Sequence, residues 1–263
     1  MSTAGSYTVA LAKGQGMVSE TILLLKAWRP GMSPTELSQL LREQGLISKA
    51  SARRASDLVK EVFAPRYLCD DAGPAKQLRA LVEKDLGSEK LRQLFLLHTA
   101  RANAILHDFI AEVYWKHYSA GAAFLQTQDA LTFVLGAHST GRIPRPWSES
   151  MKIRMAQYLL ACLTDFGLTR DRPKGGKEIK PFAILNSTTI YLAHEAHFTG
   201  LSDHAVLAHA DWRMFGLDRQ GVLEELRKVA DEGHFIVQFS GDLLRISWKY
   251  KTMEECLDGI AQR

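Results

Sequence analysis

The stretch that decides the fold is SEKLRQLFLLHTARANAILHDFIAEVYWKHY, which runs from Ser88 to Tyr118 without a proline or a glycine. Apolar side chains recur along it at steps of three, four or seven residues, and this spacing keeps one face of a helix apolar at about 3.6 residues per turn. The pattern predicts a central helix over 88–118, either continuous or broken near 99–103, with other helices packed on its apolar face. The apolar positions are Leu91, Phe95, Ala102, Leu106, Phe109 and Val113.

Polar residues occupy the other side of this predicted helix. Asp108, Glu112 and Lys116 follow one another at steps of four. A glutamate four residues before a lysine is the favoured order for an ion pair, which contributes about 0.2–0.5 kcal/mol on an exposed face. Two carboxyl groups one turn apart are also the arrangement of an acid–base pair. A solvated stripe explains the spacing more simply, and we expect one here.

The composition is typical of a globular protein. A chain of 263 residues exceeds the commonest domain size of about 100–150. Its 46% of hydrophobic and 24% of charged residues are enough to build a folded core. We expect two domains, over residues 1–140 and 141–263, because HSTGRIPRPW at 138–147 is rich in turn-forming residues.

The cysteine pattern and the apolar runs bear on the compartment. Cys69, Cys162 and Cys256 are far apart and form no C-x-x-C pair, which is typical of a reducing environment. The first residues show no basic start followed by a long apolar region, so no signal peptide is expected. No apolar run reaches the roughly 20 residues of a membrane span. We therefore expect a cytoplasmic protein without contact to a membrane.

The best-marked helix of the N-terminal half begins after residue 33. Ser33 is a candidate N-cap, Pro34 suits the first helical position, and Glu36 stands where a capping box needs a carboxylate. Gly45 follows the last turn, as a glycine commonly does at the end of a helix. These residues predict a helix from 34 to 44.

A second helix is predicted from Ser48 to Phe63, ended by Pro65-Arg66-Tyr67. With the preceding helix and the short turn at Gly45 it predicts a helix-turn-helix over 33–64. Its outer side carries a basic stripe. Charge on the outer side of an amphipathic helix is most often solvated, and it is also the means by which proteins contact phosphates. Both interpretations stay open for the stripe, which consists of Lys49, Arg53, Arg54 and Lys60.

A second basic segment is RDRPKGGKEIK at 170–180, which follows a helix predicted over 148–166. Its proline and glycines predict a hairpin or a loop, with Arg172, Lys174 and Lys177 toward the tip. A helix followed by a hairpin with a basic tip resembles a DNA-binding wing. A flexible surface loop is the alternative.

The period of the sequence changes in GHFIVQFSGDLLRISW, where apolar and polar residues alternate. This alternation predicts a β-hairpin over 234–249 with its turn at Ser240-Gly241-Asp242. Short helices predicted over 187–197, 202–209 and 219–232 precede it. Three helices followed by a hairpin is the order of a winged helix. The balanced charge of 219–232 favours packing or a partner contact over the reading of a DNA groove.

Motifs for catalysis are missing from the sequence. His194 and His197 are three residues apart, whereas a zincin needs two histidines at i and i+4. Neither a G-x-S-x-G elbow nor a phosphate-binding G-x-x-x-x-G-K-[ST] occurs, and GQG at 14–16 lacks the third glycine of a dinucleotide site. We predict a protein that is not an enzyme, with no catalytic residue, no bound metal and no cofactor.

Several segments, taken in order, carry a resemblance. They are YTVALAKGQGMVSETILLLKAW at 7–28, ARANAILHDFIAEVYW at 100–115, MKIRMAQYLLACLTDFGL at 151–168, DWRMFGL at 211–217 and GHFIVQFSGDLLRISW at 233–248. In this order they resemble the BrxA family of bacteriophage exclusion (BREX) defence systems. The resemblance implies a mainly helical bundle similar to the NusB antitermination factor, with helix-turn-helix or winged-helix elements and a small C-terminal hairpin. It also implies DNA binding without catalysis and other BREX proteins as partners.

Three hypotheses for function follow. The first is a non-catalytic protein that binds double-stranded DNA mainly through phosphates, and the net charge of +4 leans toward such a polyanionic partner. The second is an assembly adaptor whose aromatic residues Trp212, Phe215 and Trp248 are exposed and dock on another BREX component. The third is RNA binding, by analogy with NusB alone. The first would use Lys49, Arg53, Arg54, Lys60, Arg172, Lys174 and Lys177.

Overall fold

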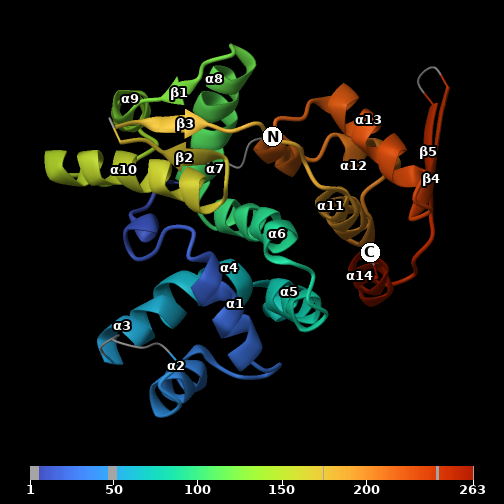
Figure 1. The fold of residues 1–263 in the computed structure, drawn as a ribbon, viewed down its shortest axis with the longest axis horizontal. Coiled ribbons are helices and arrows are strands. Elements are labelled where there is room, and N and C mark those ends of the chain that lie inside the picture. The colour runs from blue at the N-terminus through green and yellow to red at the C-terminus, as the bar shows by residue number, and fades with distance from the viewer. Residues whose placement is uncertain (1–5, 47–51, 174, 241–242, 263) are drawn as a thin grey trace. The chain divides into compact units, whose positions relative to one another are not determined.

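The computed structural model describes residues 6–46, 52–173, 175–240 and 243–262, and it confirms a mainly helical fold (Figure 1). The chain forms two compact units. The first contains residues 1–79 and 95–182, and the second contains residues 80–94 and 183–263. The boundary expected near 138–147 does not coincide with this division, because the helices on its two sides, α9 (Thr127–Ser139) and α10 (Glu149–Asp165), pack against each other within the first unit.

The N-terminal part of the first unit is a group of short helices. The helix pair expected over 33–64 is present, because α2 packs on both α3 and the turns that follow it. The elements of the whole N-terminal part are the short helix η1 (Ala10–Ala12), α1 (Val18–Ala27), α2 (Pro34–Glu43), α3 (Ala52–Asp57), the π-helical η2 (Leu58–Phe63), α4 (Ala64–Tyr67), η3 (Asp70–Ala72) and α5 (Gly73–Glu83). The last of these continues into the second unit.

The second helix of that pair does not end at Pro65, as the sequence suggested, but continues through Tyr67. The reason is the π-helical turn before the proline. The amide of Ala64 donates to the carbonyl of Val59, five residues back, and Pro65 then lies in the first turn of α4, where a helix does not need an N–H. The helix therefore passes the proline without a break, and it carries Arg66 into the core.

The predicted central helix is broken at Asn103, inside the range expected for a break. Asn103 donates its backbone N–H to Ala100, and its side-chain amide donates to the carbonyl of Thr99 at 2.8 Å. The side chain thus satisfies the carbonyl that the helix leaves open. Ala102 is exposed at this break, so its assignment to the apolar face was wrong. The pieces are α6 (Ser88–Arg101), α7 (Ala104–Phe109), the π-helical η4 (Ile110–Tyr114) and α8 (Trp115–Ser119).

A three-stranded antiparallel sheet completes the first unit. The hairpin expected around 170–180 is formed by β2 (Thr169–Asp171) and β3 (Lys177–Ile179). A third strand, β1 (Phe124–Leu125), pairs with β3 and makes the order β1-β3-β2. The sequence did not indicate β1, because a strand of two residues has no period to detect.

The second unit has the order of elements expected from the sequence. Ser202 and Asp218 cap their helices, as Ser202 accepts from the amide of Ala205 and Asp218 from that of Gly221. The predicted turn residues Gly241 and Asp242 lie outside the described residues. The elements are α11 (Asn186–Phe198), α12 (Asp203–Leu207), η5 (Ala210–Phe215), α13 (Arg219–Ala230), β4 (Phe235–Ser240), β5 (Leu243–Trp248) and α14 (Met253–Ala261).

Helix α11 is the centre of this second unit. Three helices, α12, α13 and α14, pack against it, and most of its side chains are buried. The hairpin β4–β5 is held from one side, where β4 contacts α13 and β5 contacts α12. Across the described part of the chain, no helix is both long enough and apolar enough to cross a membrane.

Candidate nucleic-acid interface

The helix pair of the first unit is locally well defined. Ser33 accepts from the amide of Glu36 at 3.2 Å, and the amide of Ser33 donates to the Glu36 carboxylate at 2.7 Å. This confirms the predicted capping box, which satisfies two amides that a helix start leaves open. Helix α2 ends with Gln44 as its C-cap, and Gly45 follows with φ near +60°, a conformation that favours glycine.

The predicted basic stripe is present in part. Arg53, Arg54 and Lys60 are exposed, while Lys49 lies outside the described residues. Arg54 donates to the carbonyl of Lys13 at 2.7 Å, so it also holds the N-terminal segment. Neither Arg53 nor Lys60 makes a hydrogen bond or an ion pair with any residue that the structure describes. These two side chains are therefore available to a ligand.

The helical geometry behind the stripe differs from the expected one. An ordinary helix of about 3.6 residues per turn would place Lys60 close beside Arg53, because seven residues make almost two full turns. Residues 58–63 instead form a π-helical segment, whose wider turn closes hydrogen bonds from i to i+5. Lys60 is consequently rotated away from the position that an ordinary helix would give it, and the stripe is broader than predicted.

The cations of the β2–β3 hairpin are largely engaged within the hairpin itself. Lys177 pairs with Asp171 across the two strands, and its side chain is only 17% exposed. The guanidinium of Arg172 lies 3.6 Å from the ring centroid of Phe124. Lys174 lies outside the described residues. Asp171 is present in the sequence of the predicted hairpin, and assigning a register to the two strands would have placed it opposite Lys177.

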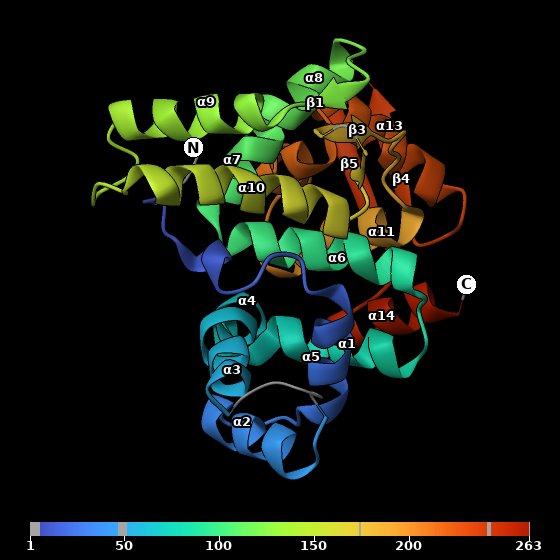
Figure 2. The same ribbon diagram turned by 60° about the vertical axis from the view of Figure 1, so that its left-hand side comes forward.

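The two predicted groups of cations are not brought together. In both views of the first unit, α10 lies between the helix α3 and the β2–β3 hairpin (Figures 1 and 2). Arg53 lies in α3 and Lys60 in η2, which directly follows it, whereas Arg172 and Lys177 belong to the hairpin. The predicted residues that the structure describes therefore do not form a single continuous surface in this unit.

The GQG segment at 14–16 has a structural role that sequence reasoning missed. Arg66 is only 3% exposed and donates to the carbonyls of Gly14 and Gln15 at 2.5 and 2.7 Å. The amide of Gly16 donates to the carboxylate of Asp165 at 2.9 Å. A Cβ on Gly16 would lie 2.3 Å from the Cβ of Asp165, so only glycine fits this approach. The backbone that a phosphate would need is thus occupied by the protein's own side chains.

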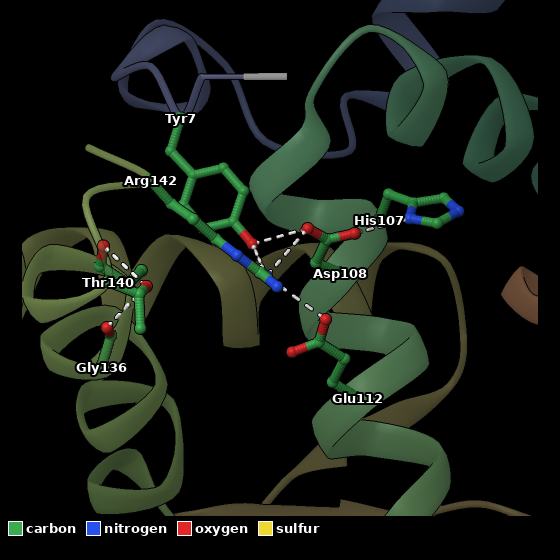
Figure 3. A network of polar contacts seen from close by, with 8 residues as sticks. Tyr7, His107, Asp108, Glu112, Gly136, Thr140 and Arg142 are labelled. Atoms are coloured by element: carbon green, nitrogen blue, oxygen red, sulfur yellow. Dashed lines mark hydrogen bonds and ion pairs between the residues drawn. The ribbon is translucent and has the colours of Figure 1, made fainter. Parts of the chain in front are cut away.

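A polar network joins the N-terminal segment to the central helix (Figure 3). The hydroxyl of Tyr7 donates to Asp108 at 2.6 Å, and Arg142 donates to that hydroxyl at 2.8 Å. Arg142 also reaches Asp108 at 3.2 Å and Glu112 at 3.3 Å. His107 contacts the other oxygen of Asp108 at 2.9 Å. The solvated stripe expected here was therefore wrong for Asp108, whose side chain is 15% exposed and bound by Tyr7 and Arg142. Glu112 is exposed as expected, with its carboxylate paired to Arg142.

The electrostatics of this network favour the ionised carboxylate. Burial alone would raise the pKa of Asp108, but the hydrogen bonds from His107 and Tyr7 and the nearby Arg142 charge together lower it. Burial and the Asp108 carboxylate raise the pKa of Tyr7, so its hydroxyl keeps its proton. The network is thus an ion pair between Arg142 and Asp108, and the Tyr7 hydroxyl forms a hydrogen bond with each of the two. These bonds hold the N-terminal segment in place.

The aromatic residues proposed for an adaptor role are mostly inside the second unit. Trp212 is 1% and Phe215 2% exposed, so neither can dock on a partner. The indole N–H of Trp212 donates to the carbonyl of Val206 at 2.7 Å, which satisfies its one polar group within the core. Trp248 is half-buried, with its ring stacked on His197 at 4.3 Å. The prediction that these residues are exposed was wrong for Trp212 and Phe215, because η5 turns its aromatic side inward.

The histidines of the second unit are dispersed among packing roles. His194 is buried among four aromatic rings, and its Nδ1 lies 2.9 Å from the carbonyl of Ile190. Burial lowers its pKa to about 4. His204 contacts Arg219 at 2.9 Å, and His209 lies 3.4 Å from Asp211. Within the described ranges, no three histidine, cysteine, aspartate or glutamate side chains gather as metal ligands would.

Comparisons with known proteins agree with the family indicated by the sequence. The family model of BrxA matches residues 5–196. The crystal structure of an uncharacterized protein from Magnetospirillum magneticum is similar, with a TM-score of 0.59 and 14% sequence identity over 80% of this chain and 98% of that chain. At this identity the likeness shows the fold alone, and no curated protein matches the chain. Because the family model spans more than half of the sequence, the chain belongs to the BrxA family and is a BREX-associated protein.

Proposed function

We propose that this protein binds double-stranded DNA through phosphate contacts, as a non-catalytic component of a BREX system that works beside other BREX proteins. The observation that carries the proposal is the pair Arg53 and Lys60. Both are exposed on the second helix of a helix-turn-helix-like pair, and neither has a partner among the described residues. Exposed cations without a carboxylate are the groups that phosphates recruit, because no existing ion pair must be broken.

The hairpin contributes less to this proposal than the sequence suggested. Lys177 and Arg172 would have to leave Asp171 and Phe124 before they could contact DNA. Arg54 has two roles, because the loss of its side chain would also release the Lys13 carbonyl. Arg53 and Lys60 are therefore the residues whose replacement tests DNA binding without disturbing the fold.

The test is a salt titration of binding to duplex DNA by the double variant Arg53→Gln/Lys60→Gln and by the unmodified protein. Each lost phosphate contact lowers the slope of log affinity against log salt by about 0.9, so we expect a loss of about 2 in the double variant. The control is Arg170→Gln/Lys76→Gln. It removes the same charge from cations already paired with Glu178 and Asp71, and its slope should change less.

Three results would contradict the proposal. The first is an unmodified protein that does not bind duplex DNA at about 100 mM salt. The second is a double variant with the same slope and affinity as the unmodified protein. The third is a clear preference for RNA over duplex DNA in a parallel titration, which would favour the RNA-binding alternative.

A further inference from the structure

The outer face of the β4–β5 hairpin carries large apolar side chains in water. Ile236 is 62% and Leu243 71% exposed, while the opposite face, with Phe235 and Ile246, is 1% and 5% exposed. Isolated exposed apolar residues are common, but these two share one face of one hairpin. No need of the fold accounts for this, since the inner face alone packs on the unit.

The register places a polar pair between the two apolar residues. Ile236 lies opposite Ser247, Gln238 opposite Arg245, and Ser240 opposite Leu243. Side chains two positions apart on a strand share a face, so all three rows point outward. At about 3.3 Å per residue the two apolar rows are roughly 13 Å apart. The face thus presents an arginine and a glutamine flanked by two separate apolar side chains.

Contacts on the inner face and at the edge of β5 hold the hairpin in place. Phe235 and Trp248 pack against each other on the inner face, at 5.5 Å between ring centroids. The amide of Ile246 on the outer edge of β5 donates to Asp203 at 2.8 Å, which occupies one of the groups that another strand would need.

The charge of this surface favours a polyanion over an apolar partner. Residues 235–249 contain two cations, Arg245 and Lys249, and one acid, Asp242. Arg227 of α13 lies 5.5 Å from the ring centroid of Phe239, which belongs to the inner face of the hairpin. Two apolar side chains separated by a polar row do not form the continuous apolar centre that a protein interface needs.

We propose that this outer face enters the major groove of DNA, which admits a two-stranded β-ribbon. Gln238 and Arg245 face the base edges, where glutamine pairs with adenine and arginine with guanine. Ile236 and Leu243 contact thymine methyl groups, and Lys249 faces a phosphate. The inference rests on the proposed DNA binding and gives it a place in the second unit, together with a preference for thymine.

The test compares a duplex containing thymine with the same duplex containing uracil, which lacks only the methyl group. We expect the unmodified protein to bind the thymine duplex roughly threefold to tenfold more tightly, since one buried methyl group contributes about a fourfold change in affinity. The variant Ile236→Thr/Leu243→Thr should lose this difference. Threonine suits a strand, so the hairpin should be retained. The matched control is Leu135→Thr/Ile153→Thr, two residues of the first unit that are 41% and 47% exposed.

The outcomes separate this inference from the proposed function. A thymine preference that the hairpin variant loses and the control keeps supports the inference. A hairpin variant that binds both duplexes like the unmodified protein overturns it, while DNA binding itself stands. Absence of duplex binding by the unmodified protein overturns both proposals. A hairpin variant with intact DNA binding that no longer co-purifies with other BREX proteins would also overturn the inference, and would assign the face to a protein partner.

Discussion

Replacing Arg66 by methionine should destabilise the first unit far more than the same change at Arg54. Both arginines bind carbonyls of the N-terminal segment, Arg66 those of Gly14 and Gln15 and Arg54 that of Lys13. They differ in burial, because Arg66 is 3% exposed and Arg54 is an exposed side chain. The pair therefore tests whether the segment is held from inside the unit or from its surface.

The magnitude follows from the number and burial of the bonds. A hydrogen bond to a charged group contributes about 1.5–3 kcal/mol, and Arg66 makes two. Part of this is offset in the native state by the desolvation of the guanidinium, which also lowers its pKa. We expect Arg66→Met to lower the free energy of unfolding by about 3 kcal/mol. Water can replace the exposed contact in Arg54→Met, which should cost less than about 1 kcal/mol.

Urea denaturation followed by circular dichroism measures both variants. The two units need not unfold together, so the transition of the first unit is identified by hydrogen exchange at residues 6–16 and 52–67. Equal losses in the two variants, or a loss below about 1 kcal/mol for Arg66→Met, would refute the role of Arg66 as the internal anchor of this segment.

Three further predictions address other contacts. Tyr7→Phe should lower stability by about 1–2 kcal/mol and speed hydrogen exchange in the N-terminal segment, since it removes the hydroxyl that Asp108 accepts from. The second unit should lose stability as pH falls from 6.5 to about 4, because burial lowers the pKa of His194 to about 4 and the unfolded chain then binds the extra proton; His194→Phe should flatten this slope in pH-dependent urea titrations. Gly136→Ala, in open space on α9, should raise the melting temperature, whereas Gly16→Ala should lower it because the added Cβ clashes.

Part of the candidate interface could be predicted from the sequence. Arg53 and Lys60 were recognised from their place on an amphipathic helix, and the structure leaves both exposed. The hairpin cations were recognised too, but their availability was overestimated. Whether Lys177 is free depends on which residue lies opposite in the strand pair, and Asp171 does. The sequence gives the number of charged residues, whereas the register of the β2–β3 strand pair decides which of them form ion pairs.

Local interactions explain what the sequence determined by itself. The helix starts at Ser33, Ser202 and Asp218 each depend on a side chain and an amide three residues away. The helical period of 88–118 and the alternation of 234–249 are likewise properties of neighbouring residues. The mainly helical class and the C-terminal hairpin could therefore be predicted without any tertiary information, whereas the break in the central helix was one of two alternatives that the pattern left open.

Tertiary structure alone decided which polar groups meet and which aromatic rings are buried. Tyr7 binds Asp108 across 101 residues and Arg142 across 135. Arg66 enters the core because a π-helical turn carries the helix past Pro65. Trp212 turns inward through a short helix that has no period long enough to show its face. A periodic pattern identifies the apolar side of one element, but packing decides which distant residue lies against it.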